Sequence, residues 1–301
     1  MRPTVPVLIL GLVAGGPACR QRTGVTAPVL NGEGSLPPGC AVVATLDRKA
    51  MGALGDAASR LVSPPGATPA MLGGVDLATG ARFIELCRLP GNGPQSKGGP
   101  YVILMSGDFP ADILEKAARA NDPPLALQWI DGSRVLGHDR NWIARRGVNP
   151  LTGELVIASD LGVMRATLSG HAASYAIDPT APISLVMAPS EIARLLPSRQ
   201  GDQPSPVAAV RELRATLEPG AKALNATFVV GSDDASRQLA AGLEPTLAVL
   251  AKQIAGGGTA AAPRIEVRRE GGDVRARIEL PAAALEALAA RVTAARPRTR
   301  Q

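Results

Sequence analysis

The sequence predicts an α+β protein built from two similar halves, each a mostly antiparallel sheet with helices packed on one face. Three observations predict this class. Short apolar runs of strand length alternate with longer stretches whose apolar residues recur at helical spacing. Asx-Gly and Gly-Gly pairs separate several of the runs, which indicates hairpins. The order of elements in the first half recurs in the second. With 301 residues, 46% of them hydrophobic, the chain can bury a substantial core.

In the first half, the expected strands are apolar runs bounded by polar or turn residues, at 41–46, 82–88, 101–105, 125–130, 135–136, 142–145 and 155–158. Helices are expected at about 47–61, 110–120 and 160–168. Asp47, Asp108 and Asp160 precede these helical periods, and their carboxylates can cap free backbone amides. The pair Asp131-Gly132 predicts a tight turn between two of the strands.

In the second half, strands are expected at 183–187, 223–230, 265–269 and 274–280, the last two joined as a hairpin across residues 270–273. Helices are expected at 190–196, 206–217, 232–254 and 281–295. Pro245 and Gly242 are expected to kink the third of these helices, and Gly256 to Gly258 to terminate it. Pro281 occupies the first position of the last helix, where proline is favoured.

Three pairs of segments carry the likeness between the halves. CAVVATLDRKAMGAL and PISLVMAPSEIARLL each predict a strand and then a helix. YVILMSGDFPADILEKAARA and ATFVVGSDDASRQLAAGLE each predict a strand, a glycine, acidic residues and a helix. LALQWIDGSRVL and IEVRREGGDVRARIEL each predict a turn-linked hairpin. Duplication of one module would explain this shared order of elements. The alternative is chance, because any α+β chain can show such a recurrence.

The amino terminus has the layout of an export signal. Arg2 is followed by an apolar run over residues 5–14 and by small residues that lead to Cys19. The run is too short to cross a bilayer, which takes about 20 apolar residues. Residues 1–18 are therefore predicted to be a signal peptide that takes no part in the fold.

The segment Gly16-Pro17-Ala18-Cys19 resembles the lipobox of bacterial lipoproteins. The resemblance implies that Cys19 is lipidated and that the lipid attaches the chain to a membrane. It departs from the family at Gly16, where a branched aliphatic residue is usual, and at Pro17. Arg20 stands where an aspartate would imply inner-membrane retention, so the resemblance implies the outer membrane. Ordinary cleavage after Ala18, or an uncleaved anchor, are the alternatives.

Changes in composition divide the rest of the chain into a tether, two folded modules and a tail. Residues 19–38 are rich in Gly, Pro and Thr and predict a tether. A first α+β module is expected at 39–175, a second at 176–295 and a basic tail at 296–301. GDFPADIL, WIDGSRV and ELVIASDLGVMRATL are similar to segments of uncharacterised exported proteins of GC-rich Gram-negative bacteria, a group that supplies no activity to carry over.

The chain has three cysteines. If Cys19 is lipidated, Cys40 and Cys87 remain as an even pair in an oxidising compartment. Each lies at the end of an expected strand, so a disulfide is predicted, with two buried free thiols as the alternative. Their spacing matches no zinc pattern, and no metal is expected.

Composition also argues against several functions. Only 2% of residues are aromatic, which disfavours stacking sites for sugars and single-stranded nucleic acid. The net charge of +6 comes from scattered arginines rather than a band, so no nucleic-acid partner is expected. The loop GNGPQSKGG lacks the spacing of a phosphate-binding loop, and no cofactor is expected.

No catalytic residue is predicted. His138, Asp139 and Ser133 could be imagined as a catalytic triad, but no GxSxG elbow is present and adjacent residues on a strand point to opposite faces. His171 follows a helix end and suits the carbonyl terminus of that helix. The sequence thus favours a non-enzymatic, lipid-anchored envelope protein that faces the periplasm or the surface and acts in binding, assembly or scaffolding, with an envelope protein as partner. The alternatives are an exported hydrolase with a site assembled from distant residues and a soluble periplasmic binder of small ligands.

Overall fold

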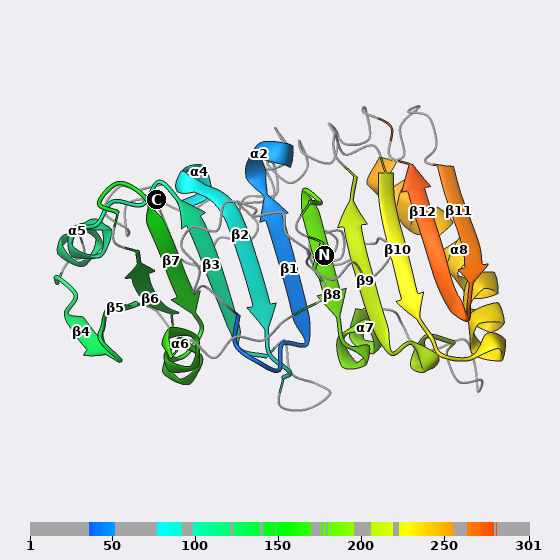
Figure 1. Ribbon diagram of the computed structural model, residues 1–301, viewed down its shortest axis with the longest axis horizontal. Helices are drawn as coiled ribbons and strands as arrows, with labels where there is room; N and C mark the ends of the chain where they lie inside the picture. Colours follow the sequence, from blue (N-terminus) through cyan, green and yellow to red (C-terminus); the bar gives the residue numbers. More distant parts are fainter. Residues whose placement is uncertain are drawn as a thin grey trace. The chain divides into compact units, whose positions relative to one another are not determined.

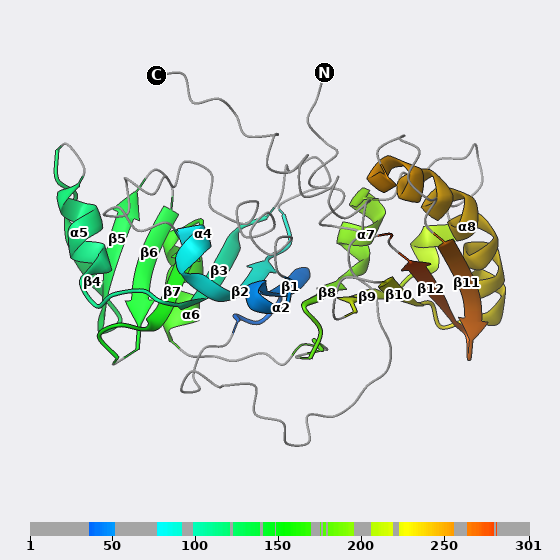
Figure 2. The same cartoon turned by 90° about the horizontal axis from the view of Figure 1, so that it is seen from above.

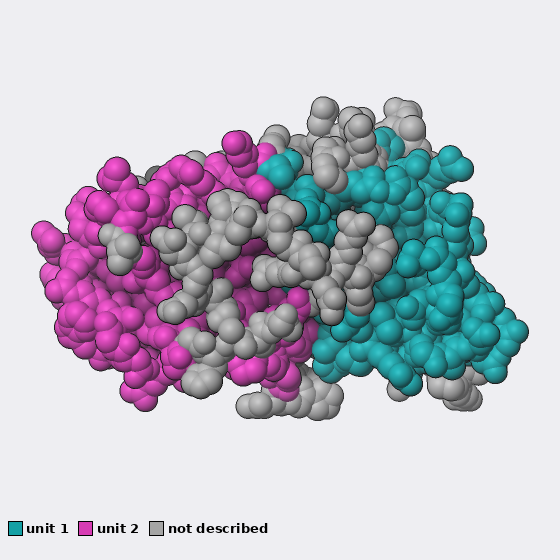
Figure 3. Space-filling model, in the orientation of Figure 1, with its two compact units in different colours: residues 1–23, 50–58, 176–301 teal, residues 24–49, 59–175 magenta. Residues whose placement is uncertain are grey.

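The computed structural model describes residues 36–51, 77–91, 99–120, 123–138, 141–147, 149–169, 175, 177–178, 180–195, 206–218, 223–255, 264–279 and 281. The predicted signal peptide, Cys19, most of the tether, the last helix and the basic tail lie outside these residues. Figure 3 colours the two compact units: the N-terminal unit (residues 24–49 and 59–175) and the C-terminal unit (residues 1–23, 50–58 and 176–301). Both have mixed α and β content dominated by antiparallel sheet, as the sequence predicts for the fold class.

The described residues of the N-terminal unit form seven strands in the order β1-β2-β3-β7-β6-β5-β4, and every neighbouring pair is antiparallel (Figure 1). The strands are β1 (Val42–Asp47), β2 (Ala81–Arg88), β3 (Tyr101–Gly107), β4 (Leu127–Ile130), β5 (Ser133–His138), β6 (Asn141–Arg146) and β7 (Gly153–Ala158). Short helices α2 (Arg48–Met51) and α4 (Leu77–Gly80) lie between β1 and β2 in the sequence.

Helices cover both faces of this sheet. Four consecutive β3 residues, 102–105, are buried, which requires cover on each side. The register places Arg134 and Arg146 on opposite faces. Arg134 pairs with Glu115 of α5 (Ile113–Arg119), whereas Arg146 donates to the Thr167 carbonyl of α6 (Leu161–Leu168). The expectation of helices on one face is therefore wrong for this unit, because the alternation of strands with helices does not show to which side each helix turns.

The predicted turn at Asp131-Gly132 joins β4 to β5. Asp131 has φ +47° and Gly132 φ +77°, so both central residues are left-handed. A type I′ turn requires this combination, and its backbone twist matches that of the two strands it joins.

In the C-terminal unit, the part of the chain that the structure describes forms five strands in the order β8-β9-β10-β12-β11, again all antiparallel. They are β8 (Ile183–Met187), β9 (Glu212–Leu217), β10 (Ala223–Val229), β11 (Arg264–Glu270) and β12 (Asp273–Glu279). Figure 2 shows helices α7 (Pro189–Leu195) and α8 (Asp233–Ala255) on the same side of this sheet. Helix α8 packs against β11 and β12, where Arg269 donates from Nε to Ser236 Oγ at 3.0 Å.

One face of this sheet forms the core under the helices. Alternate residues of the strands are buried on that face, among them Leu213, Ala215, Leu217, Leu224, Phe228, Val274, Ala276 and Ile278. The residues between them are mostly polar. An antiparallel sheet with one covered face and one open face shows this alternation.

The helix expected at 206–217 is wrong. Residues Pro206–Ala209 form a short 3₁₀ turn, and Glu212–Leu217 are strand β9. Five of the six residues of the segment ELRATL are good helix formers, which favoured the helical interpretation. Its strict alternation of polar and apolar residues places Leu213, Ala215 and Leu217 on the buried face, and this period of two decides the structure.

Helix α8 continues through Pro245 to Ala255. Among the helices in the described part of the chain, none is both long and apolar enough to span a membrane.

The structure confirms the predicted disulfide between Cys40 and Cys87, whose Cα atoms are 5.5 Å apart. Tyr175 reinforces the same place. Its hydroxyl donates to the Pro37 carbonyl at 2.7 Å and accepts from the Cys40 amide at 3.1 Å. Residues 37–40 are therefore tied both to β2 and to the last residue of the unit.

Candidate functional site

The open face of the C-terminal sheet is the candidate site. Its centre is the β11–β12 hairpin, where every second residue points away from α8. Those that line the groove described next are Glu266, Arg268 and Glu270 on β11 and Arg275 and Arg277 on β12. The turn of the hairpin contains Gly271 and Gly272, both with positive φ, as a tight two-residue connection requires.

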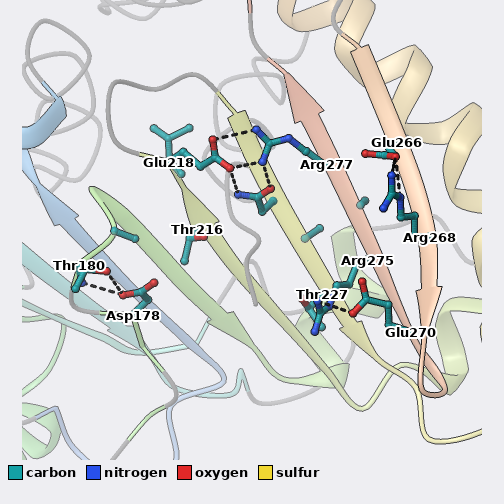
Figure 4. A pocket seen from close by; sticks show the side chains of 15 residues that line it. Asp178, Thr180, Thr216, Glu218, Thr227, Glu266, Arg268, Glu270, Arg275 and Arg277 are labelled. Carbon is teal, nitrogen blue, oxygen red and sulfur yellow. Dashed lines mark hydrogen bonds and ion pairs between the residues drawn. The ribbon is translucent and has the colours of Figure 1, made fainter. Parts of the chain in front are cut away.

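A groove of about 420 Å³ runs over this face (Figure 4). Besides the hairpin, polar side chains of β9 and β10 and of the segment before β8 line it: Asp178, Thr180, Thr216, Glu218, Asn225 and Thr227. The groove is thus built within one unit, by residues from five separate stretches of the sequence. Its volume lies within the range of small-ligand sites.

Arg277 is the most fully bonded of the groove arginines. It binds Glu218 through both terminal nitrogens, with Nη2 3.1 Å from Oε2, and donates from Nη1 to Asn225 Oδ1 at 3.1 Å. The Asn225 amide in turn donates to Glu218 Oε1 at 3.0 Å. The hydrogen bond that Arg277 donates to Glu218 raises the pKa of Arg277 above its usual value, with a further contribution from Glu279. This triad fixes one end of the groove.

The other two groove arginines pair along the hairpin. Arg275 Nη1 lies 2.6 Å from Glu270 Oε2, and Arg268 Nε lies 2.7 Å from Glu266 Oε1. The Arg268 side chain is 69% exposed and the Arg275 side chain 39% exposed. Ion pairs this exposed contribute at most about 1 kcal/mol each to stability, so folding alone does not explain the concentration of charge.

The chemistry available here is recognition. The groove presents guanidinium and carboxylate groups side by side, and it contains neither histidine nor cysteine. In the described part of the chain, no three His, Cys, Asp or Glu side chains are grouped so that they could hold a metal ion. The arrangement suits the binding of a charged or polar partner.

The residues singled out from the sequence lie elsewhere. Cys19, Asp139 and His171 fall outside the described residues. Cys40 and Cys87 form a disulfide in the N-terminal unit. Ser133 and His138 are the first and last residues of β5, five positions apart. Since a strand rises about 3.3 Å per residue, their Cα atoms are about 17 Å apart.

Sequence reasoning missed the groove arginines because the chain's arginines look scattered along the sequence. A usable signal is present in RIEVRRE and DVRARIE. In each segment the charges fall at every second residue, and the turn between them brings both sets onto one face of a hairpin. A count of clustered charge along the chain does not detect this pattern.

Neither a protein-family model nor a curated protein matches this sequence. Crystal structures of TP0453 are similar to it in fold. Crystal form I is 11% identical with a TM-score of 0.48 and covers 89% of this chain and 98% of its own. Crystal form III has the same identity and TM-score, and the match covers 88% of this chain and 98% of the TP0453 chain. Form IV is 10% identical with a TM-score of 0.44, with 85% and 93% covered.

Proposed function

We propose that this protein is a non-enzymatic, lipid-anchored component of the cell envelope that binds a partner through the open face of its C-terminal sheet. The observation that carries the proposal is that face itself. Among the described residues, helices lie on only one side of the sheet, and the other side presents a charged groove. The disulfide supports export, because such bonds persist in oxidising compartments.

The anchor is the acylated side chain of Cys19, exposed when residues 1–18 are removed. Residues 20–38 then act as the tether between the membrane and the folded body. Intact mass of the native protein tests this directly. The expected mass is that of a chain beginning at Cys19 plus its acyl groups. An unmodified chain beginning at Cys19, or a chain that retains Met1, contradicts the anchor.

The two units arose by duplication of one antiparallel module. Three features support this. In each unit three strands consecutive in the sequence lie side by side in the sheet, β1-β2-β3 in one and β8-β9-β10 in the other. A helix follows the third strand in the sequence, and a later hairpin pairs with the free edge of that third strand. The hairpin in that place is β6–β7 in one unit and β11–β12 in the other, rather than β4–β5 as the sequence comparison suggested. An experimental structure tests this: failure of the two five-strand sets to superpose ends the idea.

Crosslinking from the open face tests the binding function. A photo-reactive amino acid is placed at position 268, on the open face, and in a matched variant at position 237, on α8 at the covered side. In intact cells we expect one discrete adduct from position 268, weakened by Arg275→Gln, and no such adduct from position 237. Equal adducts from both positions, or none from 268, contradict the proposal.

The size of the groove favours a second candidate, a periplasmic binder of small ligands. A volume of about 420 Å³ can hold a molecule of a few tens of atoms. Under this alternative, position 268 gives no protein adduct, whereas a small ligand protects the native chain against thermal unfolding.

A further inference from the structure

Strand β11 is the outer strand of the C-terminal sheet, and no other described strand pairs with its free edge. The two-residue turn makes Glu270 and Asp273 a hydrogen-bonded pair, so alternate residues of β11, counted back from Glu270, direct their amides and carbonyls to β12. The amides and carbonyls of Ile265, Val267 and Arg269 point to the free edge, where no described residue hydrogen-bonds to them. This edge can therefore accept a further strand.

Helix α8 does not seal this edge. It packs against one side of β11 and β12, and the β12 residues on that side, Val274, Ala276 and Ile278, are buried. Their neighbours on β11, Ile265 and Val267, remain partly exposed. An added strand would remove these apolar side chains further from water, which favours its binding.

The charges of β11 indicate which strand fits the edge. On the open face they alternate in the order Arg264, Glu266, Arg268 and Glu270. The same series read backwards has the opposite sign at every position. When two β11 strands pair antiparallel about a two-fold axis at Val267, Arg264 lies opposite Glu270 of the second copy, and Glu266 lies opposite Arg268. Opposite charges in such cross-strand positions are stabilising.

The same register suits the backbone. It aligns Val267 with Val267 of the second copy and Ile265 with Arg269, so every amide and carbonyl at the free edge finds a partner. The charged residues then occupy the alternate, non-hydrogen-bonded positions, where opposed side chains approach most closely. Backbone pairing and charge pairing therefore select one and the same register.

Charged residues on an edge strand usually prevent two sheets from joining, so their order along β11 is decisive. A slip of two residues in one direction would place Glu266 opposite Glu266 and Arg264 opposite Arg268. A slip in the other direction would place Arg268 opposite Arg268 and Glu266 opposite Glu270. Like charges in opposed positions are destabilising. The sequence of β11 thus disfavours the neighbouring registers and permits the one centred on Val267.

We propose that the protein forms a two-fold dimer in which β11 pairs antiparallel with β11 of a second copy, centred on Val267. The two C-terminal sheets then join into one continuous sheet, and their open faces lie side by side. The contact of Arg268 with Glu266 on the same strand is an exposed ion pair, so its exchange for a contact between copies costs little.

The pairing uses the edge of the sheet and leaves the open face free. It therefore goes beyond the partner binding proposed above and does not depend on it. A photo-crosslink from position 268 to a second copy has twice the mass of the chain, which distinguishes it from an adduct with a different protein. A single pair of strands is a small interface, so we expect a reversible equilibrium between monomer and dimer.

Sedimentation equilibrium of two charge-reversal variants and of their mixture provides the test. The parent is the full chain in a Cys19→Ser background, which carries no lipid. Arg268→Glu places a carboxylate opposite Glu266 of the second copy, and Glu266→Arg places a guanidinium opposite Arg268. Each variant alone should therefore dimerise at least tenfold more weakly than the parent. Mixed in equal amounts, the two variants should form a heterodimer with the affinity of the parent, because every opposed pair then has opposite charges.

Arg237→Glu is the matched control, because it makes the same change of charge on an exposed side chain of α8, and it should dimerise like the parent. Arg268 is similarly exposed, so its replacement leaves the fold intact. Repulsion within one chain is not relieved by mixing, so recovery in the mixture reports the interface itself. A parent that stays monomeric, single variants that dimerise like the parent, or a mixture that does not recover overturns the inference.

Discussion

Removal of the disulfide should destabilise the N-terminal unit by a calculable amount. Cys40 and Cys87 are separated by 47 residues, and the bond closes a loop of that length in the unfolded chain. On the chain-entropy account, closing such a loop stabilises the folded state by about 4 kcal/mol. A single domain is stabilised in total by about 5–15 kcal/mol, so the double variant Cys40→Ala/Cys87→Ala should be close to unfolding at 37 °C.

Urea unfolding followed by tryptophan fluorescence measures this change in one unit. Trp129 and Trp142 are the only tryptophans of the chain, and both lie in the N-terminal unit. The measurement is made in a Cys19→Ser background, which leaves no other thiol and no lipid. Reduction of the parent protein with dithiothreitol is the control and should lower the free energy of unfolding by the same amount as the double variant.

A change below about 1 kcal/mol, with the fluorescence transition otherwise intact, would refute the loop-closure reasoning. It would mean that the tie between Tyr175 and residues 37–40, or residual structure in the unfolded chain, already holds these segments together.

Three further outcomes are expected. Asp160→Ala should cost about 1 kcal/mol in thermal unfolding, because the Asp160 carboxylate accepts the Val163 amide at 2.9 Å and caps α6; an unchanged melting temperature would contradict that role. Gly107→Ala should lower the free energy of unfolding by about 3 kcal/mol or more, because the added Cβ would lie 2.0 Å from the Gly80 carbonyl oxygen. Gly132→Ala is the control: its Cβ meets no neighbouring atom, so that only the strain of a positive φ destabilises it. Burial raises the pKa of Tyr101 above its usual value. In a Tyr175→Phe variant, where Tyr101 is the remaining tyrosine, the absorbance of its phenol should therefore titrate with a midpoint above pH 10, and the stability that the protonated phenol contributes should be complete below pH 10 and fall above it. A midpoint at or below pH 10 would contradict the burial of Tyr101.

Local signals in the sequence predicted most strands and the starts of α6 and α8 correctly. Asp131-Gly132 and the glycines of the β11–β12 turn require left-handed backbone, which few other residues adopt, so the hairpins could be placed from sequence. The N-cap at Asp160 is similarly local. The disulfide was predictable from the number of cysteines, the expected oxidising compartment and the position of Cys40 and Cys87 at the ends of expected strands.

Features that depend on long-range pairing could not be predicted. The side to which a helix turns is decided by packing, so the placement of α5 and α6 on opposite faces left no trace in the periodicity. The insertion of β6–β7 next to β3, ahead of β4–β5, is likewise a matter of sheet order. The groove needs Glu218, Asn225 and Arg277 side by side, and only the register of three strands brings them together.

Hydrogen–deuterium exchange of the native chain in isolated membranes tests the central claim most directly. The reference is the same chain released from its partner by extraction. The account predicts slower exchange in membranes over Arg264–Glu270 and Asp273–Glu279, with α8 unchanged, because the partner covers the open face alone. Protection confined to α8, or identical exchange in both samples, would contradict a binding role for that face.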